Sequence, residues 1–333
     1  MKVDELRTTL EKYDTATLKE IAVELYKMIP KSRKQDSVID ELLLDFTKEK
    51  DKPAKKDAPV NFETLKAEIE QFLVYADMQY YLAPNQYVRK EQRSKWRFEV
   101  KRFIKELIKI GGENSEEAGS LLAKIYNMLS YGCHYCIFST ENPFSSVGYE
   151  QVDLLSLVLK KIFYSGFSVN AIKSAVFLTL DSNVNWNTLH RNLMSVLVDI
   201  LKTTDTKEMA LLQCIAYREE YDSYNSAKNI FKESDRSGYR RKEHRNHAVE
   251  LYLLLRFGLY EFDEGIEYFW ENYVEERDNE IKLYCLLCYF LSGDDNHLKS
   301  LWIREYEKAV ANGIKPRESL QNEYVQRIKE TRA

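Results

Sequence analysis

The chain has 333 residues, of which 44% are hydrophobic and 31% are charged, and these proportions exclude an intrinsically disordered chain. Only 11 glycines and 6 prolines are present, so the sequence has few of the residues needed for sheet turns or for a glycine-rich phosphate loop. The net charge of −4 excludes a protein that is positive overall, and any nucleic-acid binding must depend on local basic patches. The scarcity of glycine and proline predicts an all-α fold.

Residues 1–49 are predicted to form a small module of three short helices. Apolar residues recur in three windows at the spacing of one helix face, and a proline separates the second window from the third. Thr17 and Glu20 have the spacing of a capping box, which predicts that the second helix starts at Thr17. Residues 50–61 are rich in lysine and contain two prolines, so they are predicted to be a flexible linker.

Part of this module, TLKEIAVELYKMIPKSRKQDSVIDELL at residues 17–43, resembles the helix, extended loop, helix domains of the SAP and Rho-termination-factor N-terminal type. The resemblance implies that DNA or RNA binds at the loop, through Lys31, Ser32, Arg33 and Lys34. Charge is consistent with this, because cations beside a helix N-terminus can contact phosphate oxygens. The alternative is a small protein-docking domain, since the loop has no glycine and acidic residues follow it closely.

Residues 62–205 are predicted to form a helical body, because helical periodicity continues with few interruptions. Residues 132–150 are the longest stretch predicted to be non-helical, and a loop of this length is either functional or mobile. Helices are predicted at residues 62–76, 86–110, 115–130, 150–164, 168–180 and 186–203, and a further helix at 206–219 begins the next region.

A basic helix is predicted within residues 88–110, which contain nine lysines and arginines against three glutamates. An apolar stripe occupies one face, so the surplus positive charge lies on the other. That face is either an ordinary solvated surface or a surface that contacts phosphates, with Arg93, Arg97 and Lys101 as candidate contacts.

Residues 206–333 contain an internal repeat. VELYLLLRFGL (249–259) aligns with IKLYCLLCYFL (281–291) at a shift of 32 residues, and the same shift aligns Trp270 with Trp302. Each copy is predicted to be a helical hairpin whose second helix has an aspartate as its N-cap, Asp263 in the first copy and Asp295 in the second. The pattern resembles tetratricopeptide-like and HEAT-like helical repeats, which implies an α-solenoid-like stack that presents a surface to partners.

A third, looser copy of the hairpin is predicted at residues 210–231. It is joined to the regular copies by a basic connector, SDRSGYRRKEHRNH at residues 234–247, which a glycine is expected to make flexible. Arginines beside a tyrosine suit phosphate binding and base stacking. The connector is therefore either an ordinary solvated linker or a nucleic-acid contact, with candidate residues Arg236, Arg240, Arg241 and Arg245.

Two C-x-x-C pairs raise the question of a zinc site: Cys133 with Cys136, and Cys285 with Cys288. In the 32-residue register Cys285 aligns with Leu253, so the second pair is interpreted as part of a helix core, where a free cysteine acts as a small hydrophobe. No metal site is predicted on this interpretation. The alternative is a zinc site that unites both pairs through the fold.

The sequence contains none of the common nucleotide-binding, hydrolase or metalloprotease motifs, so we predict no catalytic residue and no cofactor. No apolar run approaches the ~20 residues needed to cross a bilayer, and the five cysteines cannot all pair, so a cytoplasmic location is expected. The leading hypothesis is a non-enzymatic adaptor or scaffold that binds a protein partner through its helical repeats. The alternative is a DNA- or RNA-binding protein that uses the first module and the basic helix.

Overall fold

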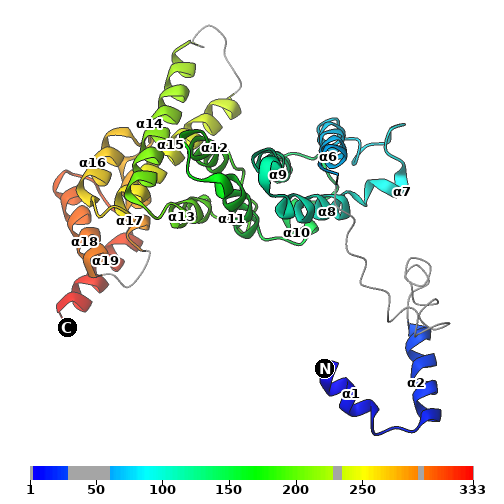
Figure 1. Cartoon of the computed structure of the whole chain (residues 1–333). Coiled ribbons are helices and arrows are strands. Elements are labelled where there is room, and N and C mark those ends of the chain that lie inside the picture. Colours follow the sequence, from blue (N-terminus) through cyan, green and yellow to red (C-terminus); the bar gives the residue numbers. More distant parts are fainter. Residues whose placement is uncertain (1–2, 29–60, 228–234, 292–295, 333) are drawn as a thin grey trace. The chain divides into compact units, whose positions relative to one another are not determined.

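The computed structural model describes residues 3–28, 61–227, 235–291 and 296–332. The chain forms two compact units, Met1–Val60 and Asn61–Ala333. Over the described ranges there are 16 α-helices, two short 3-10 helices and no strand, which confirms the predicted all-α class (Figure 1). The predicted third helix of the first module, the linker before Asn61, the loop residues Lys31, Ser32, Arg33 and Lys34, and the predicted N-cap Asp295 lie outside the described residues.

The described part of the first unit consists of α1 (Val3–Leu10) and α2 (Thr15–Met28). The capping prediction for α2 was wrong by three residues. Asp14 precedes the helix and its side-chain Oδ1 accepts a hydrogen bond from the backbone N–H of Thr17 at 3.0 Å. A carboxylate is a strong N-cap and also interacts favourably with the positive end of the helix dipole, which explains why Asp14 takes this position instead of Thr17. Hydrogen bonding to Thr17, first through its side chain and then through its backbone N–H, lowers the pKa of Asp14.

The second unit begins with the predicted helical body, whose helix starts agree with local capping chemistry. Asn61 precedes the first helix and its side chain accepts from the backbone N–H of Thr64 at 3.2 Å, as an N-cap does. The long predicted helix at 86–110 is instead two helices, separated at Ser94 and Lys95. The helices of this part are α6 (Phe62–Asp77), α7 (Lys90–Arg93), α8 (Trp96–Lys109), α9 (Ser115–Tyr131), α10 (Pro143–Val147), α11 (Gln151–Ile162), α12 (Val169–Leu180) and α13 (His190–Ile200).

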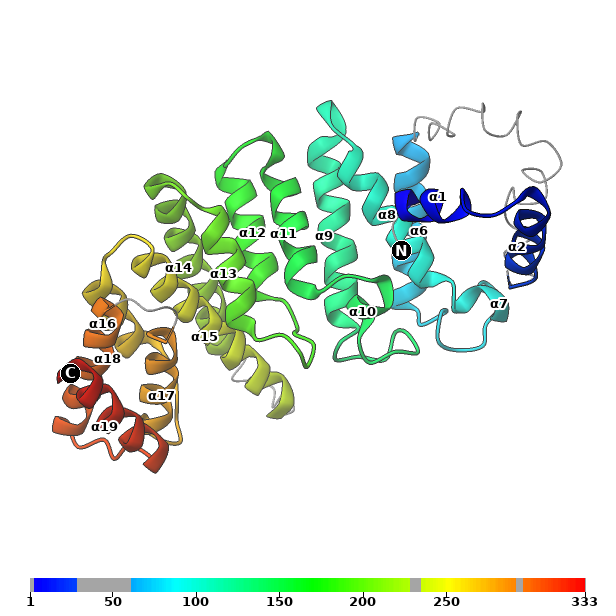
Figure 2. The ribbon, with the colours of Figure 1, turned by 90° about the horizontal axis from the view of Figure 1, so that it is seen from below.

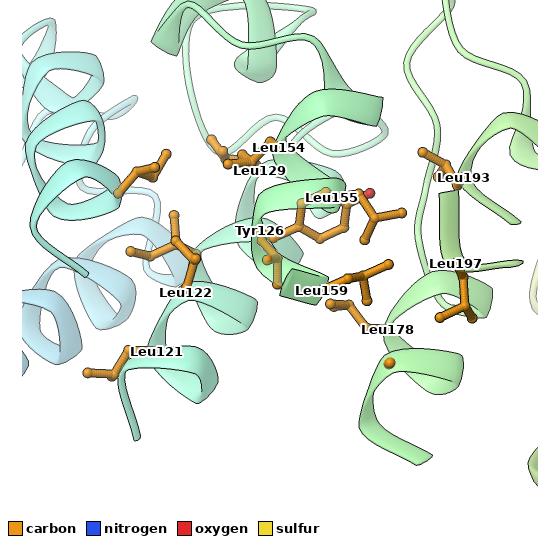
Figure 3. Close-up of a cluster of buried hydrophobic side chains, with 14 of the residues drawn as sticks. Leu121, Leu122, Tyr126, Leu129, Leu154, Leu155, Leu159, Leu178, Leu193 and Leu197 are labelled. Atoms are coloured by element: carbon orange, nitrogen blue, oxygen red, sulfur yellow. The ribbon is translucent and has the colours of Figure 1, made fainter. Parts of the chain in front are cut away.

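These helices pack on one another largely in chain order (Figure 2). Helix α9 contacts α6 and α8 on one side and α11 on the other, and α11 in turn contacts α12 and α13. Leucines from the facing sides, such as Leu122, Leu129, Leu155 and Leu159, are fully buried around Tyr126 (Figure 3). Burial of apolar surface between successive helices therefore holds this part of the unit together.

The segment 132–150 differs from its prediction, because it is packed and partly helical. Helix α10 lies within it, and Asn142 caps that helix by accepting from the backbone N–H of Ser145 at 3.1 Å. Phe138 is buried and stacks on the indole ring of Trp96, with ring centres 3.8 Å apart. The aromatic side chains of this segment thus cover the end of α8 and contribute to the core.

The last part of the second unit contains α14 (Thr204–Ala227), α15 (Asp235–Phe257), α16 (Phe262–Asn272), α17 (Asn279–Tyr289), α18 (Asn296–Ala311) and α19 (Glu318–Arg332). Two predictions were wrong here. The expected hairpin at 210–231 is a single helix, α14, as far as Ala227. The connector 234–247 was expected to be flexible, but from Asp235 onward it is part of α15, and Gly238 lies inside that helix. Helix α15 packs against α14 and α16.

The predicted repeat corresponds to two pairs of packed helices, α15 with α16 and α17 with α18. Leu251, Leu255, Leu283 and Leu287 are buried as predicted, each with at most 1% of its surface exposed. The capping prediction for Asp263 was wrong, because α16 already begins at Phe262 and Asp263 lies in its first turn. An acidic residue there still interacts favourably with the helix dipole.

Helix α15 belongs to two hydrophobic cores at once. Leu251 and Leu255 lie in the core shared with the helical body, whereas Val249 and Leu253 lie in the core formed with α16 to α19. All four side chains are fully buried. Helix α15 therefore contributes side chains to the hydrophobic cores of both parts of the second unit.

Candidate protein-binding groove

The basic residues predicted on the helix at 88–110 occupy different environments. Arg93 is half-buried, and its Nε donates to the carbonyl oxygen of Val88 at 3.1 Å. Arg97 is exposed, and its guanidinium carbon lies 5.0 Å from the ring centre of Phe98, which is itself 63% exposed. Lys101 is also exposed. Two of the three candidates thus face solvent.

The basic residues predicted at 234–247 lie on α15. The side chains of Arg236, Arg240 and Arg241 are outside the described part of the structure. Arg245 is half-buried, and its Nε lies 2.6 Å from Oδ1 of Asp222 while its Nη1 donates to the carbonyl oxygen of Asn272. Its guanidinium therefore joins α14, α15 and the end of α16.

The two basic stretches are not neighbours in the fold. Helix α8 packs on α9 and α10, whereas α15 packs on α12, α13, α14 and α16. A single basic surface that combines them does not form among the described residues.

The cysteines are dispersed in the same way. Cys133 is half-buried against the first core and Cys285 is half-buried against the second, where its Sγ accepts a hydrogen bond from the hydroxyl of Tyr273 at 3.4 Å. Burial raises the pKa of both thiols, that of Cys133 to about 12. Among the described residues no group of three or more His, Cys, Asp or Glu side chains could hold a metal ion.

A groove of about 700 Å³ lies between α16 and α18, and we call it the α16–α18 groove. Its lining contains four carboxylates and two cations, so two negative charges remain after pairing. The apolar lining includes Ile266, Trp270 and Ala309. The charged residues are Asp263, Glu267, Glu271, Arg304, Glu305 and Lys308.

Arg304 joins the two walls of the groove. Its Nη2 atom lies 2.7 Å from Oδ1 of Asp263 on α16 and 3.1 Å from Oε1 of Glu305 on its own helix. Glu305 is buried, with 1% of its side chain exposed, and its second oxygen accepts a hydrogen bond from Trp270 Nε1 at 3.3 Å. The buried carboxylate is therefore satisfied from both helices, which keeps the groove in one geometry.

Trp270 also contacts Lys282. The lysine ammonium lies 5.5 Å from the ring centre, and it donates hydrogen bonds to the carbonyl oxygens of Trp270 and Tyr273. Burial is the main cause that lowers the pKa of this lysine. The indole is thus oriented before any ligand binds, which reduces the entropy lost on binding.

Glu267 and Glu271 are exposed on α16, one turn apart, and have no ion-pair partner among the described residues. A cationic ligand could contact them without displacing an existing pair. The sequence analysis missed this site. The spacing of Asp263, Glu267, Trp270 and Glu271 does indicate one helix face, but only the packing of α18 beside α16 shows that this face lines a groove.

No protein-family model, curated protein or solved structure matches the chain. Over the described residues, no helix combines the length and the apolar character needed to cross a membrane.

Proposed function

We propose that this chain is a non-enzymatic adaptor that binds a protein partner through the α16–α18 groove, and that the groove takes a partner segment carrying lysine or arginine. The observation that carries the proposal is the excess of carboxylates around a tryptophan that is already oriented by Glu305 and Lys282. Aromatic side chains such as tryptophan often dominate the energy at the centre of a protein interface, and an excess of charge of one sign favours a partner of the opposite sign.

In this proposal Trp270 supplies the apolar contact and Glu267 and Glu271 supply the charge. The volume of about 700 Å³ lies within the range of sites that enclose a small ligand or a few side chains. Each exposed ion pair contributes about 0.5 kcal/mol, so the two glutamates together account for about 1 kcal/mol, or about a fivefold change in affinity. The contact is expected to weaken as salt is added.

The test is fluorescence anisotropy of a labelled lysine- and arginine-rich peptide with the full chain, at low and at moderate salt. Replacing both Glu267 and Glu271 with glutamine should weaken binding about fivefold. The matched control replaces Glu63 and Glu70, two exposed acids of α6, with glutamine and makes the same change in net charge. Equal binding by both double variants, or equal binding of an acidic peptide of the same length, would refute the proposal.

A second candidate function is nucleic-acid binding, and the exposed pair of Arg97 and Phe98 on α8 favours it. A cation beside an exposed aromatic ring suits contact with a phosphate and stacking with a base. Titration with mixed-sequence DNA and RNA separates the two candidates. If this candidate is correct, replacing Arg97 with glutamate weakens binding, while the glutamine variants of the α16–α18 groove leave it unchanged.

A further inference from the structure

The two walls of the α16–α18 groove differ in charge. The α16 wall runs from Asp263 to Glu271, and every charged residue that lines it is acidic. The α18 wall runs from Arg304 to Asn312, and its exposed charged residues are basic. Glu305 also belongs to that wall, but its carboxylate is buried and already accepts from both helices. The negative charge of the groove is therefore concentrated on one side of it.

The opposite charges of the two walls pair at only one place. Nη2 of Arg304 lies 2.7 Å from Oδ1 of Asp263 and joins the walls there. Elsewhere Glu267 and Glu271 on α16 and Lys308 on α18 are exposed, and no ion pair connects them with each other or with another described residue. Both signs of charge are thus available to a ligand, each on its own side of the groove.

The space between the charged walls is apolar. Ile266 and Ala309 are each 2% exposed, whereas Trp270 and Ile314 are half-buried, and all four line the groove. Because the apolar residues are the less exposed ones, they form the floor and the charged residues form the two edges. A ligand that fits must carry a narrow apolar stripe with charged groups on both sides of it.

The backbone of the walls favours a helical ligand over an extended one. Within a helix the N–H and C=O groups bond to each other, so they cannot form a ladder with an extended peptide. The last carbonyl groups of α18 are occupied as well, because the N–H groups of residues 312–314 bond to them. An α-helix needs no such ladder, since its own backbone hydrogen bonds are internal.

The dimensions of the groove agree with a short helix. The lining of each wall extends over eight residue steps, from 263 to 271 and from 304 to 312, which is about 12 Å along a helix axis. A ligand helix that runs along the groove would make contact over about two turns. Helices that bind in grooves present apolar residues at i, i+3, i+4 and i+7, which matches this length.

We propose that the partner segment is an amphipathic α-helix whose charge is divided between its two flanks, with lysine or arginine facing α16 and aspartate or glutamate facing α18. In this arrangement the apolar stripe contacts Ile266 and Trp270, the basic flank pairs with Glu267 and Glu271, and the acidic flank pairs with Lys308. The inference rests on the proposed function, which requires only the basic flank, and it adds the helical form and the acidic flank.

The contribution of Lys308 can be isolated because its sign is opposite to that of the facing glutamates. One exposed ion pair changes affinity about twofold, and a like-charge contact weakens it by a similar factor. Changing an attraction at this position into a repulsion should therefore alter affinity about fivefold. The direction of the change depends on the charge that the ligand presents to α18, which makes the direction the informative result.

The test is fluorescence anisotropy of the full chain with three labelled peptides, at about 150 mM KCl to suppress non-specific attraction. Each peptide has about 18 residues, because shorter helices are marginal in water, and each has the same leucine stripe. The first has lysines on one flank and glutamates on the other, and the second has lysines on both flanks. The third is the first with a central proline, which should weaken binding at least tenfold by breaking the helix.

Lys308→Glu should weaken binding of the first peptide about fivefold and strengthen binding of the second by a similar factor. The matched control is Lys124→Glu on α9, which makes the same change in net charge at an exposed site outside the groove and should do neither. Asn312→Lys adds a cation to the α18 wall and should act in the opposite sense, with about a twofold gain for the first peptide and about a twofold loss for the second.

The outcomes separate this inference from the proposed function. If Lys308→Glu moves both peptides in the same direction, or acts as Lys124→Glu does, the acidic flank is refuted. Equal binding of the proline peptide refutes the helical form. If the wild type binds only the peptide with lysines on both flanks, the proposed function stands and this inference fails, whereas an absence of binding by all three peptides overturns both.

Discussion

Replacing Glu250 with glutamine should change how the stability of the second unit depends on pH. Burial raises the pKa of Glu250 from its ordinary value of 4.5 to about 7. Between these two values the folded state holds a proton that the unfolded state has lost, so stability falls as the pH rises from about 4.5 to about 7. Above about pH 7 the ionised Glu250 lowers the free energy of unfolding by its full amount, about 3 kcal/mol.

Glutamine cannot ionise and can still accept the hydrogen bond from Tyr289. The Glu250→Gln variant should therefore equal the wild type near pH 4.5 and exceed it near pH 8, by up to about 3 kcal/mol. Urea unfolding followed by circular dichroism at several pH values measures the difference between the two proteins. The difference is more informative than either curve, because the buried His190 and His247 destabilise the fold below about pH 6.5 in both proteins.

The control is Glu243→Gln, an exposed acid two turns earlier on the same helix. It should shift the wild-type curve only slightly, because exposed charges contribute little. If the Glu250→Gln and wild-type curves run parallel from pH 4.5 to pH 8, the carboxyl group of Glu250 is not held in a low-dielectric environment, and this account of its pKa fails.

Other predictions concern the repeat core, the cysteines and the first unit. Leu287→Ala should destabilise the protein by about 2 to 5 kcal/mol in urea unfolding, whereas Leu291→Ala, at a site that is 43% exposed, should cost under about 1 kcal/mol; similar costs would contradict the repeat packing. Elemental analysis should find no stoichiometric zinc, and the double variant Cys285→Ala with Cys288→Ala should stay folded; one zinc per chain that the double variant loses would reverse this interpretation. If the first unit binds nucleic acid, neutralising the three cations within residues 31–34 should reduce the log–log salt slope by at most about 3, and an absence of DNA and RNA binding at low salt excludes that function.

Most helices of the second unit could be predicted from the sequence, because their apolar residues recur at helical spacing and few breakers interrupt them. The prediction failed where tertiary contacts decide the structure. Residues 132–150 carry no helical periodicity, yet Phe138 stacks on Trp96, more than forty positions away in the sequence, and this contact orders the segment. The break between α7 and α8 at Ser94 was not predicted, because neither a proline nor a glycine occurs there.

The candidate sites were harder to predict than the fold. Arg245 lies in a run of arginines that suggests a free basic surface, but its guanidinium forms an ion pair with Asp222 on the preceding helix. Glu267 and Glu271 carry no special signal in the sequence, and they become a candidate site only because α18 packs beside them. A sequence shows which residues are charged, whereas the ion-pair partners of those residues depend on which helices pack together.

The shared position of α15 has a consequence for how the second unit unfolds. Opening this helix exposes Leu251 and Leu255 from one core together with Val249 and Leu253 from the other, so neither core survives its loss. Fraying of α19 or α18 exposes only the second core and leaves the helical body intact. Native-state hydrogen exchange should therefore be slowest in the middle of α15, and protection should decrease towards the C-terminal helices. The two parts of the second unit should unfold as separate cooperative units, and α15 should open only when both cores are lost.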